Sequence, residues 1–274
     1  MAHNTQDVFI AIDQNSTADL EAILADDPGL VHARHANPDL FHWTTLQFAA
    51  ARGKLEACRL LVEKGAEVYT NPMNTYPPVL QAVWMKHPKI VDYFLKEIPE
   101  KADGTNKLGI TLNLAAREGW IDLVRKYLEA DPLAVHQRGW IGDTCLHWPS
   151  HNNYVEILEL LLDAGADIEA DEINWASGKP LHWASEHVPK CVKLLIERGA
   201  NVDSRNEMKG TKFYGMTPLI MNATQRDDCA EITEMLLVAG ADIQAKDAAG
   251  KSAHDWARET KLPDICKILK AHLS

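Results

Sequence analysis

One short segment occurs four times in this chain, and that repetition restricts the fold more than any other feature. LLVEKGAEV at 60–68 returns as LLLDAGADI at 160–168, LLIERGANV at 194–202 and LLVAGADI at 236–243. In every copy an apolar run leads to a glycine, the residue that most often ends a helix in a left-handed conformation. A repeat of this size cannot bury its apolar face alone, so its copies must stack on one another. We therefore expect a linear array of helical repeats.

A second type of segment precedes these copies and has the pattern of a small helix. It reads TLQFAAARGKLEACR, TLNLAAREGWIDLVR, CLHWPSHNNYVEILE, PLHWASEHVPKCVK and PLIMNATQRDDCAEITE. Small paired residues such as Ala-Ala give a helix a narrow face that a neighbouring helix can approach closely. One position of this helix can be followed through the successive repeats, where it is held by Phe48, Gln81, Leu114, Trp148, Trp183, Met221 and Trp256. The distances between these residues along the chain are 33, 33, 34, 35, 38 and 35 residues.

With these segments the chain resembles the ankyrin repeat family, whose signature T-P-L-H-x-A precedes a second helix and a Gly-Ala-Asp or Gly-Ala-Asn turn. The resemblance covers about 38–274. It implies an all-α fold, an α-solenoid of stacked helix-turn-helix repeats with short β-hairpin tips. We expect a single domain over 1–274, with an N-terminal helical cap at 1–37, repeats at 38–70, 71–104, 105–136, 137–171, 172–208 and 209–247, and a C-terminal cap at 248–274. The second repeat departs from the pattern, because Leu80 replaces the histidine and a loop with Pro99 replaces the Gly-Ala-Asp turn.

Two related motifs, DTCLHWPSH at 143–151 and GKPLHWASEH at 178–187, place histidines beside tryptophans. His147 and His182 hold the histidine position of the signature, and the resemblance implies a structural role in bonding backbone groups of the hairpin loops. The second histidine of each motif follows at a different spacing, so the motifs do not share the geometry of a duplicated metal or catalytic site. We expect no metal and no cofactor here, and we expect Trp148 and Trp183 to be oversized core residues.

The charge balance narrows the range of partners. The 28 basic and 39 acidic residues give a net charge of −11, which argues against a nucleic-acid backbone or a membrane surface as the partner. No window approaches the eighteen apolar residues of a spanning helix, and the N-terminal segment lacks the features of a secretory signal. Five cysteines without a CxxC pair favour a reducing, cytoplasmic location.

Stacking leaves few positions free, and in the ankyrin family these are the hairpin tips and the residues after Ala-Ala on the first helix, which line the concave face. Aromatic residues form only 7% of the chain, yet many fall on these positions, as expected of a contact surface. The alternative is that the tip aromatics only cover neighbouring loops. The candidate binding residues are Phe41, Trp43, Tyr76, Trp84, Met85, Arg117, Trp140, His151, Trp175, His187, Phe213, Tyr214 and Met216.

Two functions remain open. The resemblance favours an interaction protein that recognises a protein partner, preferably a basic one, through an aromatic and acidic concave groove. The alternative is a small-molecule site or acid–base enzyme acting on a small apolar or aromatic molecule, with His151, Glu186, His187 and Asp143 as candidate catalytic residues. His151 and Glu186 hold the same slot on adjacent repeats, whose helices pack about 8–10 Å apart, so their side chains can meet. No GxSxG motif, HExxH motif, phosphate-binding glycine loop or dinucleotide fingerprint accompanies them.

Overall fold

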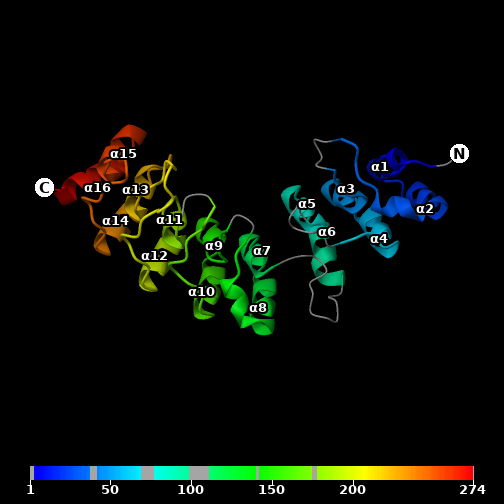
Figure 1. Cartoon of the computed structure of the whole chain (residues 1–274), viewed down its shortest axis with the longest axis horizontal. Coiled ribbons are helices and arrows are strands. Elements are labelled where there is room, and N and C mark those ends of the chain that lie inside the picture. The colour runs from blue at the N-terminus through cyan, green and yellow to red at the C-terminus, as the bar shows by residue number, and fades with distance from the viewer. Residues whose placement is uncertain are drawn as a thin grey trace. The chain divides into compact units, whose positions relative to one another are not determined.

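The chain divides into two compact units, an N-terminal unit at Met1–Ile110 and a C-terminal unit at Thr111–Ser274. The computed structural model describes residues 3–37, 42–68, 77–98, 111–139, 142–174 and 178–273. Each unit is a row of stacked helix pairs, and the described ranges contain no strand (Figure 1). The expected all-α solenoid is confirmed, whereas the single domain over 1–274 stays a prediction across the boundary between the units.

The N-terminal unit contains three helix pairs within its described residues. Helix α1 packs on α3 and α3 on α5, while α2 packs on α4 and α4 on α6. The hydroxyl of Thr45 donates a buried hydrogen bond of 2.6 Å to the carbonyl of Val31, which ties the first pair to the second. The bounds are α1 Thr5–Asp13, α2 Thr17–Asp26, the 3-10 turn η1 Pro28–His32, α3 Thr45–Ala51, α4 Leu55–Glu63, α5 Pro78–Trp84, α6 Pro88–Asp92 and the π-helical turn η3 Tyr93–Glu97.

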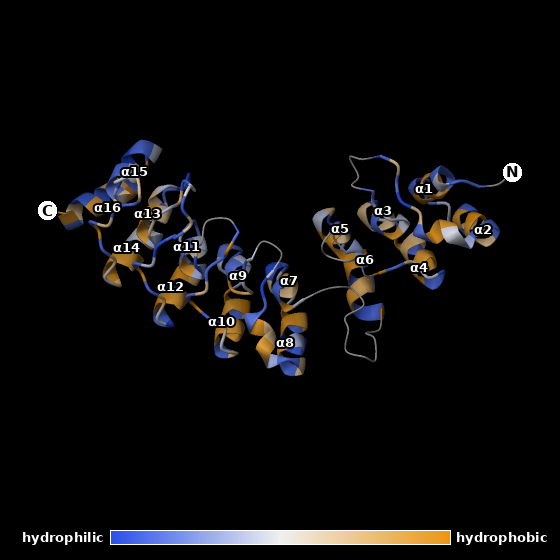
Figure 2. Cartoon of the chain, viewed as in Figure 1, coloured by the Kyte–Doolittle hydropathy of each residue, from blue (hydrophilic) through white to orange (hydrophobic). Residues whose placement is uncertain are grey.

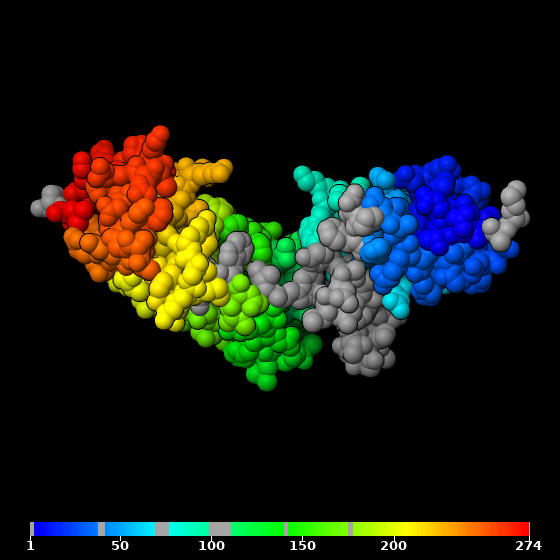
Figure 3. Space-filling model, turned by 45° about the horizontal axis from the view of Figure 1, so that its top comes forward, coloured from blue at the N-terminus to red at the C-terminus, as the bar shows by residue number. Residues whose placement is uncertain are grey.

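The C-terminal unit repeats the same pairing five times within its described residues. The first helices contact each other in the order α7, α9, α11, α13 and α15, and the second helices in the order α8, α10, α12, α14 and α16. The second helices carry much of the hydrophobic sequence, as Figure 2 shows, and Figure 3 shows the successive pairs as bands of colour from green to red. The bounds are α7 Leu112–Arg117, α8 Ile121–Ala130, η4 Pro132–His136, α9 His147–His151, α10 Val155–Asp163, α11 Pro180–Ala184, α12 Pro189–Glu197, α13 Pro218–Ala223, α14 Ala230–Val238, α15 Ala253–Thr260 and α16 Pro263–Leu273.

The histidine position of the signature closes the start of the first helix. Its side chain accepts a hydrogen bond from the backbone N–H three residues earlier, and it does so as Gln47 (2.7 Å), His147 (3.0 Å), His182 (3.2 Å) or Asp255 (2.9 Å). One of the N–H groups that a helix start leaves unpaired is thereby satisfied. Different residue types occur at this position because capping the helix requires only a hydrogen-bond acceptor on a side chain of the right length.

A histidine at this position also reaches the following repeat with its second nitrogen. The Nε2–H of His147 donates to the carbonyl of Gly178 at 2.9 Å, and the Nε2–H of His182 donates to the carbonyl of Met216 at 3.1 Å. Both rings are fully buried. The structural role implied for these two histidines is confirmed.

The second helices end as the sequence predicts. A glycine in the left-handed region follows each of four helices, with φ between 88° and 94°, at Gly65, Gly165, Gly199 and Gly240.

The expected β-hairpin tips are reduced to single bridges. These join Arg34 to Thr44, Arg138 to Thr144 and Lys246 to Ser252. An arginine supplements the sparse pairing, because the Arg138 guanidinium donates both to the carbonyl of Gly142 in its own hairpin and to that of Asp171 in the next repeat. Backbone hydrogen bonds such as that from the N–H of Gly139 to the carbonyl of Asp143 also close the hairpins. Within the described residues, no helix is long and apolar enough to cross a membrane.

Candidate functional site

The predicted binding residues fall into three groups. Phe41, Tyr76, Trp140 and Trp175 lie outside the described residues. Trp43, Trp84 and Met85 belong to the N-terminal unit, where Trp43 is half-buried and Trp84 and Met85 are 38% and 49% exposed. The others belong to the C-terminal unit: Arg117, His151, His187, Phe213, Tyr214 and Met216.

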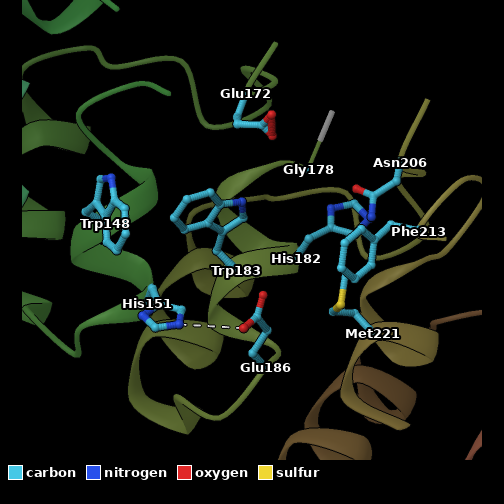
Figure 4. A pocket seen from close by; sticks show the side chains of 10 residues that line it. All are labelled: Trp148, His151, Glu172, Gly178, His182, Trp183, Glu186, Asn206, Phe213 and Met221. Carbon is cyan, nitrogen blue, oxygen red and sulfur yellow. Dashed lines mark ion pairs between the residues drawn. The ribbon is translucent and has the colours of Figure 1, made fainter. Parts of the chain in front are cut away.

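A cavity of about 250 Å³ opens in the C-terminal unit, and we call it the tryptophan pocket (Figure 4). Its walls come from three consecutive repeats, with α9 and α11 on one side and the hairpin before α13, together with α13 itself, on the other. The lining residues are Trp148, His151, Glu172, Gly178, His182, Trp183, Glu186, Asn206, Phe213 and Met221.

Two indoles at equivalent positions of α9 and α11 form the aromatic wall. The rings of Trp148 and Trp183 meet edge to face, with centroids 5.2 Å apart and planes at 81°. The guanidinium carbon of Arg117 lies 4.5 Å from the Trp148 ring centroid, in cation–π contact. Trp183 is 8% exposed and Trp148 is half-buried. The expectation that both are core residues is therefore incomplete, because their large rings extend past the packed helices and line an open cavity.

A buried carboxamide faces this cavity without a partner. Asn206 is 1% exposed, and among the described residues neither its Nδ2 nor its Oδ1 has a hydrogen-bond partner. A side chain at Gly178 would crowd this end of the pocket, since an added Cβ would lie 3.3 Å from Asn206 Oδ1 and 3.2 Å from Trp183 Nε1. An unsatisfied buried polar group costs roughly 1–3 kcal/mol. A bound molecule that pairs with Asn206 would recover that free energy.

His182 lines the pocket but is already committed to the fold. Both of its ring nitrogens bond backbone groups of Lys179 and Met216. Burial lowers the pKa of His182 to about 4, so the ring is neutral near pH 7. Burial also lowers the pKa of His147 to about 4.

The polar rim of the pocket is formed by His151, Glu186 and His187. His151 Nε2 lies 3.6 Å from Glu186 Oε2, as the dashed line in Figure 4 marks. The ring centroids of His151 and His187 are 4.6 Å apart. The Glu186 carboxylate holds the pKa of His151 above its usual range. The predicted meeting of His151 with Glu186 across adjacent repeats is confirmed.

Other predicted residues lie apart from this rim. Asp143 is 2% exposed, its backbone carbonyl accepts a hydrogen bond from the N–H of Gly139 within its own hairpin, and it does not line the pocket. Met216 is 2% exposed, and Tyr214 is half-buried with its carbonyl bonded to the N–H of Ala248. Among the tip aromatics that the structure describes, Phe213 does line the pocket. The prediction that Asp143 lies near His151 and Glu186 finds no support, because the hairpin encloses its side chain.

Sequence reasoning missed several lining residues. Glu172 and Asn206 lie in hairpins, where the repeat pattern assigns no packing role, and Met221 holds a recurring position of the repeat that by itself predicts no pocket. The doubled LHW motif was the available signal, since two indoles at one register position of adjacent repeats must lie side by side.

A second cavity of about 560 Å³ adjoins the tryptophan pocket, because the two share Glu186 and Phe213. Its lining includes Lys212, Arg226 and Asp227. Together the two cavities form a groove. The charges along this groove are mixed, in contrast to the acidic groove expected from the net charge.

Comparisons with known proteins match the repeat pattern. A family model described as ankyrin repeats (3 copies) matches residues 112–206 and 170–247, and one described as ankyrin repeats (many copies) matches residues 46–95. The chain is 30% identical over 154 residues to the rat transient receptor potential cation channel subfamily V member 6, covering 52% of this chain and 20% of the channel. It is 30% identical over 156 residues to the Arabidopsis thaliana E3 ubiquitin-protein ligase KEG, covering 57% of this chain and 9% of the ligase. It is 27% identical over 162 residues to a Caenorhabditis elegans homolog of transient receptor potential cation channel subfamily A member 1, covering 57% of this chain and 12% of that protein.

The chain thus spans a fifth or less of the length of these relatives. The two family models together match more than half of the chain. Helix pairs, capping histidines and terminal glycines agree with that match, and the chain belongs to the ankyrin repeat family.

Proposed function

We propose that the C-terminal unit binds a partner protein and that the tryptophan pocket receives one apolar or aromatic side chain of that partner. Ankyrin repeats generally mediate protein–protein interaction. The observation that carries the proposal is the buried, unpartnered carboxamide of Asn206 inside an aromatic-lined cavity. At about 250 Å³, the cavity is smaller than the roughly 300–1,000 Å³ typical of sites for drug-sized molecules, and it suits a single side chain.

The chemistry of Asn206 favours a peptide. Its carboxamide offers donors on Nδ2 and an acceptor on Oδ1, and a peptide group carries the complementary carbonyl and N–H. A partner that inserts a side chain between Trp183 and Phe213 brings its own backbone to the mouth of the pocket. Rigid aromatic walls lose little entropy on binding, and such pockets are where interface energy concentrates.

We attribute the choice of partner to the tryptophan pocket and not to the net charge of the chain. Lys212 and Arg226 face the adjoining cavity together with Glu186 and Asp227. A partner segment along this groove therefore meets charges of both signs, and the basic partner expected from the composition gains no preference here.

A second candidate is favoured by one specific observation. The His151–Glu186 pair at 3.6 Å lies at the rim, where a small apolar or aromatic molecule in the pocket would meet an acid–base group. Native mass spectrometry of the purified protein separates the candidates. A tightly held small molecule of defined mass, lost in Asn206→Leu, would replace the partner proposal with this one.

The partner proposal is tested by selecting random peptides against the full chain and measuring their dissociation constants. We expect the selected peptides to share an aromatic or aliphatic anchor. Asn206→Leu and Trp183→Ala should each weaken binding by about tenfold or more, equivalent to about 1.4 kcal/mol. Trp84→Ala is the matched control, because this exposed tryptophan lies in the N-terminal unit.

Asn206→Leu also has a stability signature that separates a binding role from a packing role. It removes two unpaired buried polar atoms at nearly constant volume, so the free energy of unfolding should rise by about 1 kcal/mol while peptide binding weakens. A variant that binds peptides as the wild type does, or that loses stability, would contradict the proposal.

A further inference from the structure

Two imidazoles and one carboxylate converge at the rim of the tryptophan pocket. His151 is the last residue of α9, and Glu186 and His187 follow α11 of the adjacent repeat. Each residue offers one ligand atom, and the three atoms lie within 4.8 Å of one another. His187 is exposed, and His151 and Glu186 are about one third exposed, so an ion from solvent can reach them. Histidine nitrogens with a carboxylate oxygen form a common ligand set for zinc.

Neighbouring hydrogen bonds fix the tautomer of His151. Asn152 Nδ2 donates to the carbonyl of Arg117 at 3.2 Å, which orients Asn152 Oδ1 toward His151 Nδ1, also at 3.2 Å. Only a protonated Nδ1 can donate to that oxygen, so the neutral ring carries its lone pair on Nε2. This is the arrangement in which an amide or carboxylate orients a metal-binding histidine.

The lone pair of His151 Nε2 faces the Glu186 carboxylate, and two electron-rich atoms in that position need a cation between them. A proton on Nε2 would make a charge-assisted hydrogen bond of about 2.7–2.9 Å. Two atoms that are each about 2.0–2.1 Å from a tetrahedral zinc ion lie about 3.3 Å apart. The observed separation of 3.6 Å is nearer to the second geometry.

We infer that His151, Glu186 and His187 bind a divalent transition-metal ion of the zinc type, in place of the absence of a metal that we expect from the sequence of these motifs. Rotation of the exposed His187 ring brings the third ligand into range, and three protein ligands leave one tetrahedral position for water or for a donor atom of a bound molecule. Because Glu186 lines both the tryptophan pocket and the adjoining cavity, that position lies at the centre of the groove. The inference is independent of the partner proposal, since metal uptake is measured without any peptide.

The test is isothermal titration calorimetry of the chelator-treated full chain with zinc chloride at about pH 7.5. We expect one ion per chain, and we expect Glu186→Gln and His187→Ala each to weaken binding by at least about tenfold. Both side chains are at the surface, so circular dichroism should show folded variants. His272→Ala is the matched control, because it removes an exposed histidine of α16 far along the array.

Cobalt(II) absorption identifies the ligands, since the chain also carries five free cysteines. A tetrahedral spectrum without a thiolate charge-transfer band, lost in Glu186→Gln, supports the inference. Absence of zinc uptake at micromolar concentrations would overturn it, leaving a plain ion pair. Equal uptake by the wild type and the two rim variants, or a thiolate band, would place the ion elsewhere and overturn it as well.

Discussion

The buried imidazole of His182 should make folding stability depend on pH, and His182→Gln should remove that dependence. The ring is fully buried, accepts a hydrogen bond from the N–H of Lys179 and donates one to the carbonyl of Met216. A proton added to Nδ1 would break the first bond and bury a charge, which is why burial lowers the pKa of His182 to about 4.

The direction of the pH dependence follows from the pKa of His182 in the folded and in the unfolded protein. The unfolded histidine has a pKa of about 6.5, so near pH 7 it is mostly neutral in both states. As the pH falls below about 6.5 the unfolded chain takes up the proton first, and stability is lost until the pH reaches the folded pKa of about 4. At pH 5 the loss amounts to about 2 kcal/mol from this residue. His147, with a pKa also lowered to about 4, adds a similar loss.

The chain itself supplies the best replacement. Gln47 holds the same position in an earlier repeat and accepts the N–H of Thr44 at 2.7 Å. His182→Gln therefore keeps the helix cap without a titrating group. Loss of the Met216 bond should cost about 1 kcal/mol at pH 7, whereas His182→Ala, which leaves two backbone groups unpaired, should cost about 1–3 kcal/mol.

The assay is urea unfolding followed by circular dichroism at pH 7 and pH 5. Between these values His182→Gln should lose about 2 kcal/mol less stability than the wild type. His272→Gln, at an exposed histidine, should behave as the wild type. An equal loss in His182→Gln and the wild type would refute the reasoning, because it would mean that the ring is protonated in the folded protein.

Three further substitutions test the stacking. Gly165→Ala should cost about 1 kcal/mol, since φ is 88° and no atom lies within 4 Å of the added Cβ. Gly119→Ala should lower the free energy of unfolding by more, about 2 kcal/mol or above, because φ is also positive there and the added Cβ would lie 2.8 Å from the Tyr154 ring. Equal losses for the two glycines would show that this ring can move away. Thr45→Val should cost about 1–2 kcal/mol by removing the bond to the Val31 carbonyl, and urea unfolding measures all three.

Much of the fold follows from the sequence because stacking repeats a few strict requirements. The capping acceptor and the terminal glycine recur in register, so residues such as His147 and Gly165 could be assigned before any coordinates. The hairpins could not, because their shape depends on contacts between repeats. Arg138 bridges its own hairpin to the carbonyl of Asp171, and Arg205 bridges the carbonyls of Gly215 and Lys246 in the same way.

The sequence predicts the site only for residues that hold the same position on adjacent repeats and therefore lie close together. His151 and Glu186 share a slot on adjacent repeats, and packed helices bring such slots together. The pocket was not predictable, because a repeat pattern says which residue faces a neighbour but not whether a large ring fills the space. Trp183 is buried and still lines a cavity, and Asn206 reaches that cavity from the hairpin of the next repeat.

The motif at 143–151 shows how one residue type serves two purposes within a single turn of helix. Both nitrogens of His147 bond backbone groups, which keeps the ring neutral near pH 7 and unable to take up a proton or a metal ion. At the other end of α9, Nδ1 of His151 bonds the side chain of Asn152, and its Nε2 pairs with the partly exposed carboxylate of Glu186. What separates a packing histidine from a chemically available one is therefore whether its ring nitrogens are bonded to buried backbone groups. On that criterion the rim of the pocket, rather than the LHW histidines, is where we expect an imidazole to meet a ligand.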